Sequence, residues 1–169
     1  MPQSNTYVGE LFEQKKYFLP QLIASAETME KAINRLEPLL EAARGNEKLA
    51  TIVVATVKGD IHDIGKNLVA LMLKNYGYHV IDLGKDVPAK VVLEAYHKHH
   101  PKAIGLSALM TTTVVSMEET ITLLKQEENM CPIFVGGAVL TEDIAQDIHA
   151  DHYTKDAMAA VNLLNEIVH

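Results

Sequence analysis

Two kinds of hydrophobic pattern alternate along the chain from about residue 50 onward. Short, continuous apolar runs are typical of strands buried on both faces, and segments whose apolar residues recur every three or four positions are typical of helices that cover a sheet. The pattern predicts strands at residues 50–57, 79–83, 103–107, 133–135 and 152–153. It predicts helices after them, at residues 64–76, 89–99, 115–126, 142–148 and 155–168.

The regular alternation of strand and helix decides the predicted fold class. A strand that is followed by a helix and then by a parallel strand forms a right-handed crossover, and repeated units of this kind build an open α/β sheet. We therefore predict an α/β fold with a flavodoxin-like, doubly wound sheet of five parallel strands in the order 2-1-3-4-5.

The pattern before residue 45 is helical only. Two helices are predicted, separated at residues 17–20, where Pro20 suits the first turn of a new helix. The second helix carries a broad apolar stripe of Leu22, Ile23, Ala26, Met29, Ile33, Leu36, Leu39 and Leu40. A helical hairpin cannot bury that stripe on itself, so something else must cover it. Gly45 is a helix stop, and we place the boundary between a short helical hairpin (residues 1–44) and the α/β domain (residues 45–169) there.

Composition and charge narrow the possible functions. The net charge is −7 and the basic residues are scattered, which argues against binding to nucleic acid. No apolar run approaches about 18 residues and the N-terminus lacks a signal-peptide pattern, so we expect neither a membrane span nor export. The single cysteine, Cys131, cannot form an internal disulfide, and we assign it no function. The expected location is the cytoplasm.

The candidate chemistry lies in the loop after the first predicted strand, which reads K-G-D-I-H-D-I-G-K-N from Lys58. Ligands of an open parallel sheet bind beyond the carboxyl ends of its strands. Asp60 and His62 are two residues apart, so the carboxylate can accept the imidazole N–H and leave the other ring nitrogen for a metal. Gly65 would let a bulky group approach the backbone, and Asp63 can cap the helix. By itself, however, a D-x-H loop is equally compatible with a surface turn.

Two further strand ends complete a larger motif. Ser107 and Leu109 follow the third strand as S-x-L, and Gly136 and Gly137 follow the fourth as G-G. Together, D-x-H-x-x-G, S-x-L and G-G resemble the cobalamin-binding domain shared by methionine synthase, corrinoid methyl-carrier proteins and B12-dependent mutases. The segment S-A-L-M-T-T-T, which begins at Ser107, resembles the corresponding segment of the corrinoid proteins of one-carbon methyltransferases and of some methionine synthases rather than that of the mutases.

The resemblance implies a cobalamin or related corrinoid cofactor, bound base-off and His-on. His62 would then be the lower ligand of cobalt in place of the vitamin's dimethylbenzimidazole. The freed nucleotide tail would enter a slot in the sheet that small residues provide, here Gly105, Ser107, Gly136 and Gly137. The residues implied to contact the cofactor are Asp60, His62, Asp63, Gly65, Ser107, Leu109, Thr111, Gly136, Gly137, Phe12 and Leu19.

The resemblance also assigns the methyl-transfer chemistry to Asp60, His62 and Thr113. Methionine synthase has a serine shortly after S-x-L, and Thr113 stands at the matching position with its hydroxyl retained. Thr113 is expected to orient Asp60 or relay a proton. Each methyl transfer is expected to make or break the bond between His62 and cobalt, with a proton taken up when that bond breaks.

The N-terminal residues resemble part of the helical cap of methyl carriers. Residues 8–12 and 17–20 are similar to the second half of the four-helix cap that covers the upper corrin face, and Phe12 and Leu19 match the residues that shield the methyl group. The first half of the cap has no counterpart in the sequence. The expected partners are methyltransferase domains or subunits, and a two-fold homodimer of the N-terminal helices would complete the bundle.

Three other functions share some of these features. A response-regulator receiver has the same fold but needs an aspartate at the end of the third strand, where Ser107 stands. A B12-dependent sensor would keep the D-x-H-x-x-G loop and add an output domain. A metal hydrolase built on residues 60–63 would need further ligands, for which Asp82 and Asp86 are the near candidates.

Overall fold

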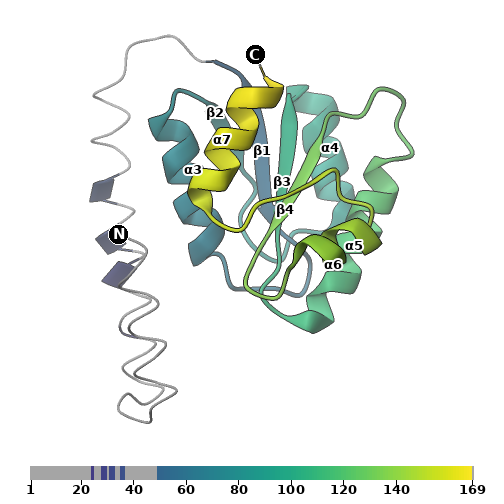
Figure 1. The fold of residues 1–169 in the computed structure, drawn as a ribbon, viewed down its shortest axis with the longest axis horizontal. Coiled ribbons are helices and arrows are strands. Elements are labelled where there is room, and N and C mark those ends of the chain that lie inside the picture. The colour runs from purple at the N-terminus through teal and green to yellow at the C-terminus, as the bar shows by residue number, and fades with distance from the viewer. Residues whose placement is uncertain (1–23, 25–27, 30, 33–34, 37–48, 169) are drawn as a thin grey trace. The chain divides into compact units, whose positions relative to one another are not determined.

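The computed structural model describes residues 24, 28, 29, 31, 32, 35, 36 and 49–168 (Figure 1). The chain divides into two compact units, Met1–Leu39 and Leu40–His169. The described residues of the first unit are helical, as predicted. The rest of the predicted hairpin, including Phe12, Leu19 and the boundary expected after residue 44, lies outside the described residues.

The second unit is built on a parallel sheet. Its strands are β1 (Thr51–Thr56), β2 (His79–Asp82), β3 (Ala103–Ser107), β4 (Ile133–Gly136) and β5 (His152–Tyr153). Every pair is parallel and the order is β2-β1-β3-β4-β5, which confirms the predicted α/β fold. The central strands β1, β3 and β4 are buried along nearly their whole length, and for that reason they read as continuous apolar runs.

The helices begin and end within two residues of the predicted positions. They are α3 (Ile64–Asn75), α4 (Ala89–His99), α5 (Val114–Leu124), α6 (Glu142–Asp147) and α7 (Ala157–Ile167). Helix α7 begins at residue 157 rather than 155 because the Asp156 carboxylate accepts the Ala159 N–H at 2.8 Å and caps the helix. A short 3-10 helix, η1 (Thr111–Thr113), precedes α5 and was not predicted.

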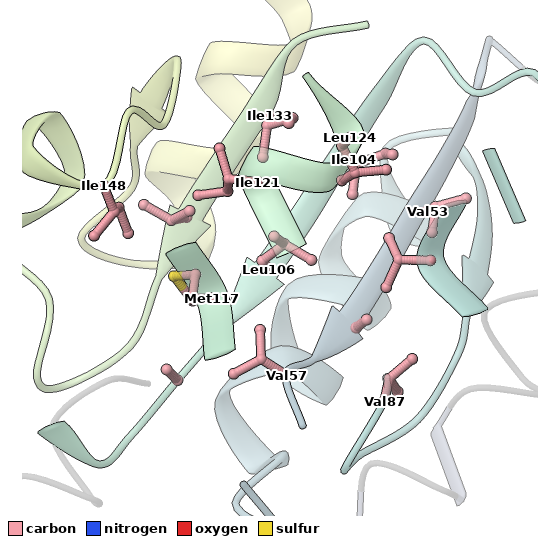
Figure 2. Close-up of a cluster of buried hydrophobic side chains, with 14 of the residues drawn as sticks. Val53, Val57, Val87, Ile104, Leu106, Met117, Ile121, Leu124, Ile133 and Ile148 are labelled. Atoms are coloured by element: carbon pink, nitrogen blue, oxygen red, sulfur yellow. The ribbon is translucent and has the colours of Figure 1, made fainter. Parts of the chain in front are cut away.

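Helices cover both faces of the sheet. Helices α3 and α7 lie on one face, over a buried cluster that includes Val54 and Phe134 (Figure 1). Helices α4, α5 and α6 lie on the other face, over a second cluster. Figure 2 shows part of this second cluster, with Ile104 and Leu106 of β3 close to Met117 and Ile121 of α5. Apolar side chains therefore fill both faces of the sheet, and the polar side chains of the sequence motifs lie in the loops at the ends of the strands.

The loops that carry the sequence motifs meet at one edge of the sheet. Parallel strands share that edge, so the β1–α3, β3–η1 and β4–α6 loops all leave from it. Main-chain hydrogen bonds join them, from Val57 N–H to Ser107 O at 3.1 Å and from Ala108 N–H to Gly136 O at 3.3 Å. In the described part of the chain, no helix has both the length and the apolar content needed to cross a bilayer.

Candidate functional site

The loop after β1 places a carboxylate inside the protein. The chain turns at Gly59, whose φ of +85° lies in the left-handed region that glycine adopts without strain. The N–H of Asp60 then donates to Val57 O at 3.1 Å. As a result, the side chain of Asp60 lies beneath the loop and is fully buried.

Hydrogen bonds reach the Asp60 carboxylate from two loops. Its Oδ1 accepts the main-chain N–H of His62 at 2.9 Å and lies 2.9 Å from His62 Nδ1. Its Oδ2 accepts the N–H of Leu109 at 2.7 Å, the N–H of Met110 at 3.3 Å and the hydroxyl of Thr113 at 2.9 Å. Burial alone raises the pKa of Asp60, but these hydrogen bonds together outweigh burial and lower the pKa from 3.8 to about 2. Asp60 is therefore ionised at neutral pH.

The charge on Asp60 decides the tautomer of His62. An ionised carboxylate can only accept a hydrogen bond, so His62 Nδ1 carries the proton between the two side chains. In the neutral ring, Nε2 then presents its lone pair away from Asp60. The His62 side chain is 47% exposed, and none of the described residues binds Nε2. The result is one oriented imidazole ligand that faces solvent.

Thr113 completes the buried end of this network. It is the last residue of η1, and its methyl carbon lies 3.5 Å from where a Cβ at Gly59 would be. Its hydroxyl lies 2.9 Å from Asp60 Oδ2 and 2.8 Å from Met110 O. Since the hydroxyl has one proton and both neighbours accept, the ionised carboxylate is the stronger competitor for it. The expected contact between Thr113 and Asp60 is present.

A third loop is tied to the same turn. Oδ1 of Asp86, in the loop after β2, accepts the Gly59 N–H at 2.7 Å, and the Asp86 N–H donates to Asp60 O at 3.0 Å. The two carboxylate oxygens of Asp82 both lie 2.5 Å from Lys66 Nζ. Both aspartates proposed as extra ligands are therefore engaged elsewhere. In residues 49–168 and the shorter described segments, no group of three His, Cys, Asp or Glu side chains could hold a metal ion. The described residues therefore do not supply the further ligands that the metal-hydrolase alternative needs.

Small side chains line the sheet edge under α3 and α7. The register pairs Thr56 with Ser107 and Ser107 with Gly136, so these three residues form a row across β1, β3 and β4. The hydroxyl oxygens of Thr56 and Ser107 are 2.9 Å apart. A Cβ at Gly136 would lie 2.9 Å from Thr154 O, so this glycine also permits close packing between β4 and the chain that follows β5.

Gly137 has a structural role of its own. Its φ is +141°, and a Cβ there would overlap the carbonyl oxygen of Ala108 and lie 2.9 Å from the carbonyl carbon. The glycine thus lets the loops after β3 and β4 approach each other closely. A larger residue at Gly137 would disturb the fold whether or not a ligand binds there.

The space beside Gly105 is not open, which corrects one expectation. Gly105 is paired in register with Phe134, and a Cβ at Gly105 would overlap Phe134 Cζ and lie 2.7 Å from Cε2. The aromatic ring therefore lies directly over the glycine and fills the volume that the missing side chain leaves. The small-residue slot expected at the sheet is therefore filled by the ring at Gly105, and Thr154 O approaches Gly136 closely as well.

The side chains of the other predicted contact residues in the described part of the chain make no hydrogen bond to Asp60. Asp63 precedes α3, but its side chain makes no capping hydrogen bond, so the predicted cap is not formed. Gly65 lies in the first turn of α3, and a Cβ there would meet nothing within 4 Å. Thr111 begins η1 and is exposed. Leu109 contributes its N–H to Asp60 while its side chain is exposed.

Three exposed apolar side chains belong to the loops and helix at this edge of the sheet. Ile61 is 64% exposed, and Leu109 and Val115, on the loop and helix that follow β3, are also exposed. Exposed apolar groups of this size at a strand edge are typical of a ligand-binding surface. A metal-containing ligand with an apolar face that still lacks one nitrogen ligand would suit these residues.

Two parts of the site have no signal in the sequence. The N–H groups of Leu109 and Met110 belong to the main chain, so no residue type identifies them as donors to Asp60. Asp86 appeared only as a possible metal ligand, whereas it anchors the turn at Gly59. Its φ of +55° is a conformation that aspartate tolerates better than most residues, but the sequence does not show it.

Comparison with known proteins gives a consistent picture. A family model described as the B12 binding domain matches residues 50–162, and a second model with the same description matches residues 5–37. The dimethylamine corrinoid protein 2 of Methanosarcina acetivorans is 42% identical over 163 residues, which are 95% of this chain and 76% of that protein. The structure of the Methanosarcina barkeri monomethylamine corrinoid protein is 32% identical with a TM-score of 0.84, over 96% of this chain and 78% of that one.

A structure of a methyltransferase complex is also similar. The methanol:cobalamin methyltransferase complex MtaBC from Methanosarcina barkeri contains a chain that is 32% identical with a TM-score of 0.70, covering 97% of this chain and 63% of that one. The matched family model spans β1 to α7 and so includes every described residue of the Asp60 network. The chain belongs to the B12-binding domain family of corrinoid proteins.

Proposed function

We propose that this chain binds a corrinoid through His62 and carries a methyl group on it between methyltransferases. The observation that supports the proposal is the buried, ionised Asp60, which holds Nδ1 of His62 and leaves Nε2 without a partner among the described residues, so that Nε2 could bind a metal. The relatives named as methylamine corrinoid proteins, and the similar chain in a methyltransferase complex, support it. The methyl donor and acceptor would bind to other domains or subunits, with this chain as the corrinoid-carrying component.

The described side chains fit a corrinoid better than a bare metal ion. A zinc site needs about three protein ligands and an open position, or about four ligands when it is structural. The described residues provide no such group, and His62 is one ligand. Cobalt in a corrin ring is already held by the nitrogens of the ring, so a single imidazole completes its lower side. The exposed side chains of Ile61 and Leu109 would offer apolar contact surface to such a ring.

The chain's own residues would control ligation and protons. The bound corrinoid supplies the cobalt that accepts and gives up the methyl group. Asp60 holds the Nδ1 proton of His62 and increases the basicity of Nε2. Nε2 of His62 would hold either the cobalt or a proton, and the adjacent Asp60 carboxylate would balance the charge of the protonated ring. Thr113 holds the carboxylate in position through its hydroxyl. Ligation and proton uptake are therefore coupled in this proposal.

The remaining contacts complete the proposal. The hydroxyls of Thr56 and Ser107 can hydrogen-bond a nucleotide tail that enters beside Gly136. Phe12 and Leu19, outside the described residues, would cover the upper side and exclude water. Such a cover has to move when a methyltransferase delivers or removes the methyl group. Residues 1–44 of two copies would pair around a two-fold axis to bury the apolar stripe of the N-terminal helices.

The absorbance spectrum of the protein with added cobalamin tests the proposal. We expect the wild-type chain to give the spectrum of a base-off, His-ligated corrinoid. His62→Ala should lose that spectrum and keep the far-UV circular dichroism of the folded domain, because His62 lies in a loop outside both hydrophobic clusters. His97→Ala is the matched control, since His97 is an exposed histidine at the end of α4. A His-ligated spectrum in His62→Ala, or its loss in His97→Ala, would refute the assignment.

A further inference from the structure

Two successive rows of residues lie on the face of the sheet under α3 and α7, one at the ligand edge and one further inward. The outer row is Thr56, Ser107 and Gly136, and all three are small. The next row inward on the same face is Val54, Gly105 and Phe134, because side chains alternate along each strand. In this inner row the glycine leaves a gap, and the ring of the neighbouring Phe134 fills it.

The ring of Phe134 is in contact with the backbone of β3. A Cβ at Gly105 would lie 2.7 Å from Cε2 and 3.1 Å from Cε1 of the ring, besides the overlap with Cζ. Phe134 is 4% exposed and belongs to the hydrophobic cluster under α3 and α7. No other aromatic ring of the described sheet strands belongs to this cluster. The ring therefore closes the inner end of the small-residue slot.

A nucleotide tail that enters this slot would reach the ring. Two rows on one face of a strand are two residues apart, about 7 Å. A phosphate, a sugar and a two-ring base in series are longer than that, so a tail that passes the outer row must extend to the level of Gly105 and Phe134. The volume it needs there is the volume that the ring occupies.

We propose that Phe134 closes the tail slot in the empty protein and must turn away from Gly105 before a nucleotide tail can enter. Phe134 thereby sets the preference of this chain between corrinoids with and without a tail. The inference rests on the proposed corrinoid function. On the side away from Gly105, Phe134 is paired in register with His152 of the edge strand β5, which is partly buried.

The Phe134 ring over Gly105 would lower the affinity only for corrinoids that have a nucleotide tail. If the ring is turned away in one molecule out of ten, the apparent affinity for a tail-bearing corrinoid is reduced about tenfold. A corrinoid without a tail binds on His62 alone, and the ring does not oppose it. The ratio of the two affinities therefore reports on Phe134 and cancels any effect on ligation by His62.

Absorbance titrations of the full-length chain with cobalamin and with cobinamide, which lacks the tail, measure that ratio. We expect Phe134→Val to increase the affinity for cobalamin relative to cobinamide about tenfold over wild type. Phe134→Leu, which retains more of the core volume, should shift the ratio in the same direction if Phe134→Val does not fold. Val135→Ala is the matched control, because Val135 is a buried residue of the same strand in the cluster on the opposite face. It should leave the ratio unchanged.

The possible outcomes separate the inference from the proposed function. An unchanged or lower ratio in both Phe134 variants overturns the inference alone, and a lower ratio would make the ring a surface on which the base stacks. An equal shift in Val135→Ala also overturns it, since the effect would then come from lost core volume. Binding of neither corrinoid by the wild-type chain overturns the proposed function and the inference with it.

Discussion

Replacing Asp60 by asparagine removes a buried charge and keeps the size of the side chain. The pKa of Asp60 is about 2 in the folded protein against 3.8 ordinarily, because its hydrogen bonds outweigh the effect of burial. A difference of nearly two pKa units corresponds to about 2 kcal/mol of stability at neutral pH. The folded pKa is the lower one, so this contribution is fully present above about pH 4 and is lost as the pH falls through about 2. By pH 3 about half of it, roughly 1 kcal/mol, has been lost.

Urea unfolding of the cofactor-free chain at a series of pH values between 7 and 3 measures this effect. We expect the free energy of unfolding of wild type to fall by about 1 kcal/mol more than that of Asp60→Asn between pH 5 and pH 3. The other carboxyl groups are present in both proteins, so their titration cancels in the comparison. A difference that stays constant over this range would show that folding does not lower the pKa of Asp60, and would refute the reasoning.

The same urea measurements on variants of Thr113 test whether its hydroxyl contributes to the lowered pKa of Asp60. Thr113→Val removes one donor to Asp60 Oδ2, so the pKa of Asp60 should rise and the extra loss of stability toward pH 3 should become smaller. Thr113→Ser keeps the hydroxyl and should retain the dependence of wild type. An identical pH dependence in the two variants would mean that the hydroxyl does not stabilise the charge.

Two further predictions concern packing and association. Gly137→Ala should lower the free energy of unfolding by about 3 kcal/mol, since its Cβ would overlap Ala108 O at a φ of +141°. Gly65→Ala should instead raise the free energy of unfolding by up to about 1 kcal/mol, because Gly65 lies in a helix and its Cβ would meet open space. Equal urea midpoints for the two variants would contradict the close approach at Gly137. The proposed pairing of residues 1–44 should give a dimer by light scattering that deletion of those residues abolishes. A monomer at every concentration excludes that dimer, and a dimer that survives the deletion places the contact elsewhere.

Features that depend on nearby residues were predicted best. The strand order and the helices follow from the change of hydrophobic period, and the pair of Asp60 and His62 follows from their separation by one residue in a loop. The predicted starts of helices were less accurate, because side-chain capping decides where a helix begins. Asp156 caps α7 and moves its start, whereas Asp63 occupies the equivalent place before α3 and makes no such bond.

Features that depend on the register between distant segments could not be predicted. Gly105 and Phe134 are both ordinary strand residues, and only the pairing of β3 with β4 brings the ring over the glycine. The donors from Leu109 and Met110 depend on the path of a loop about 50 residues away from Asp60, where the main chain rather than the residue type makes the bond. Residue patterns indicate which groups are available, whereas the partners of a buried group depend on how the loops approach each other.

The convergence of three loops on the main chain and side chain of Asp60 has a consequence for protein engineering. Asp60 receives hydrogen bonds from its own loop and from the loop after β3, and the loop after β2 fixes its main chain through Asp86. A graft of the D-x-H segment alone onto another α/β scaffold would carry over the histidine but leave the carboxylate without most of its donors. The smallest transferable unit is therefore discontinuous, and comprises the segments around Gly59 to His62, around Asp86, and from Leu109 to Thr113.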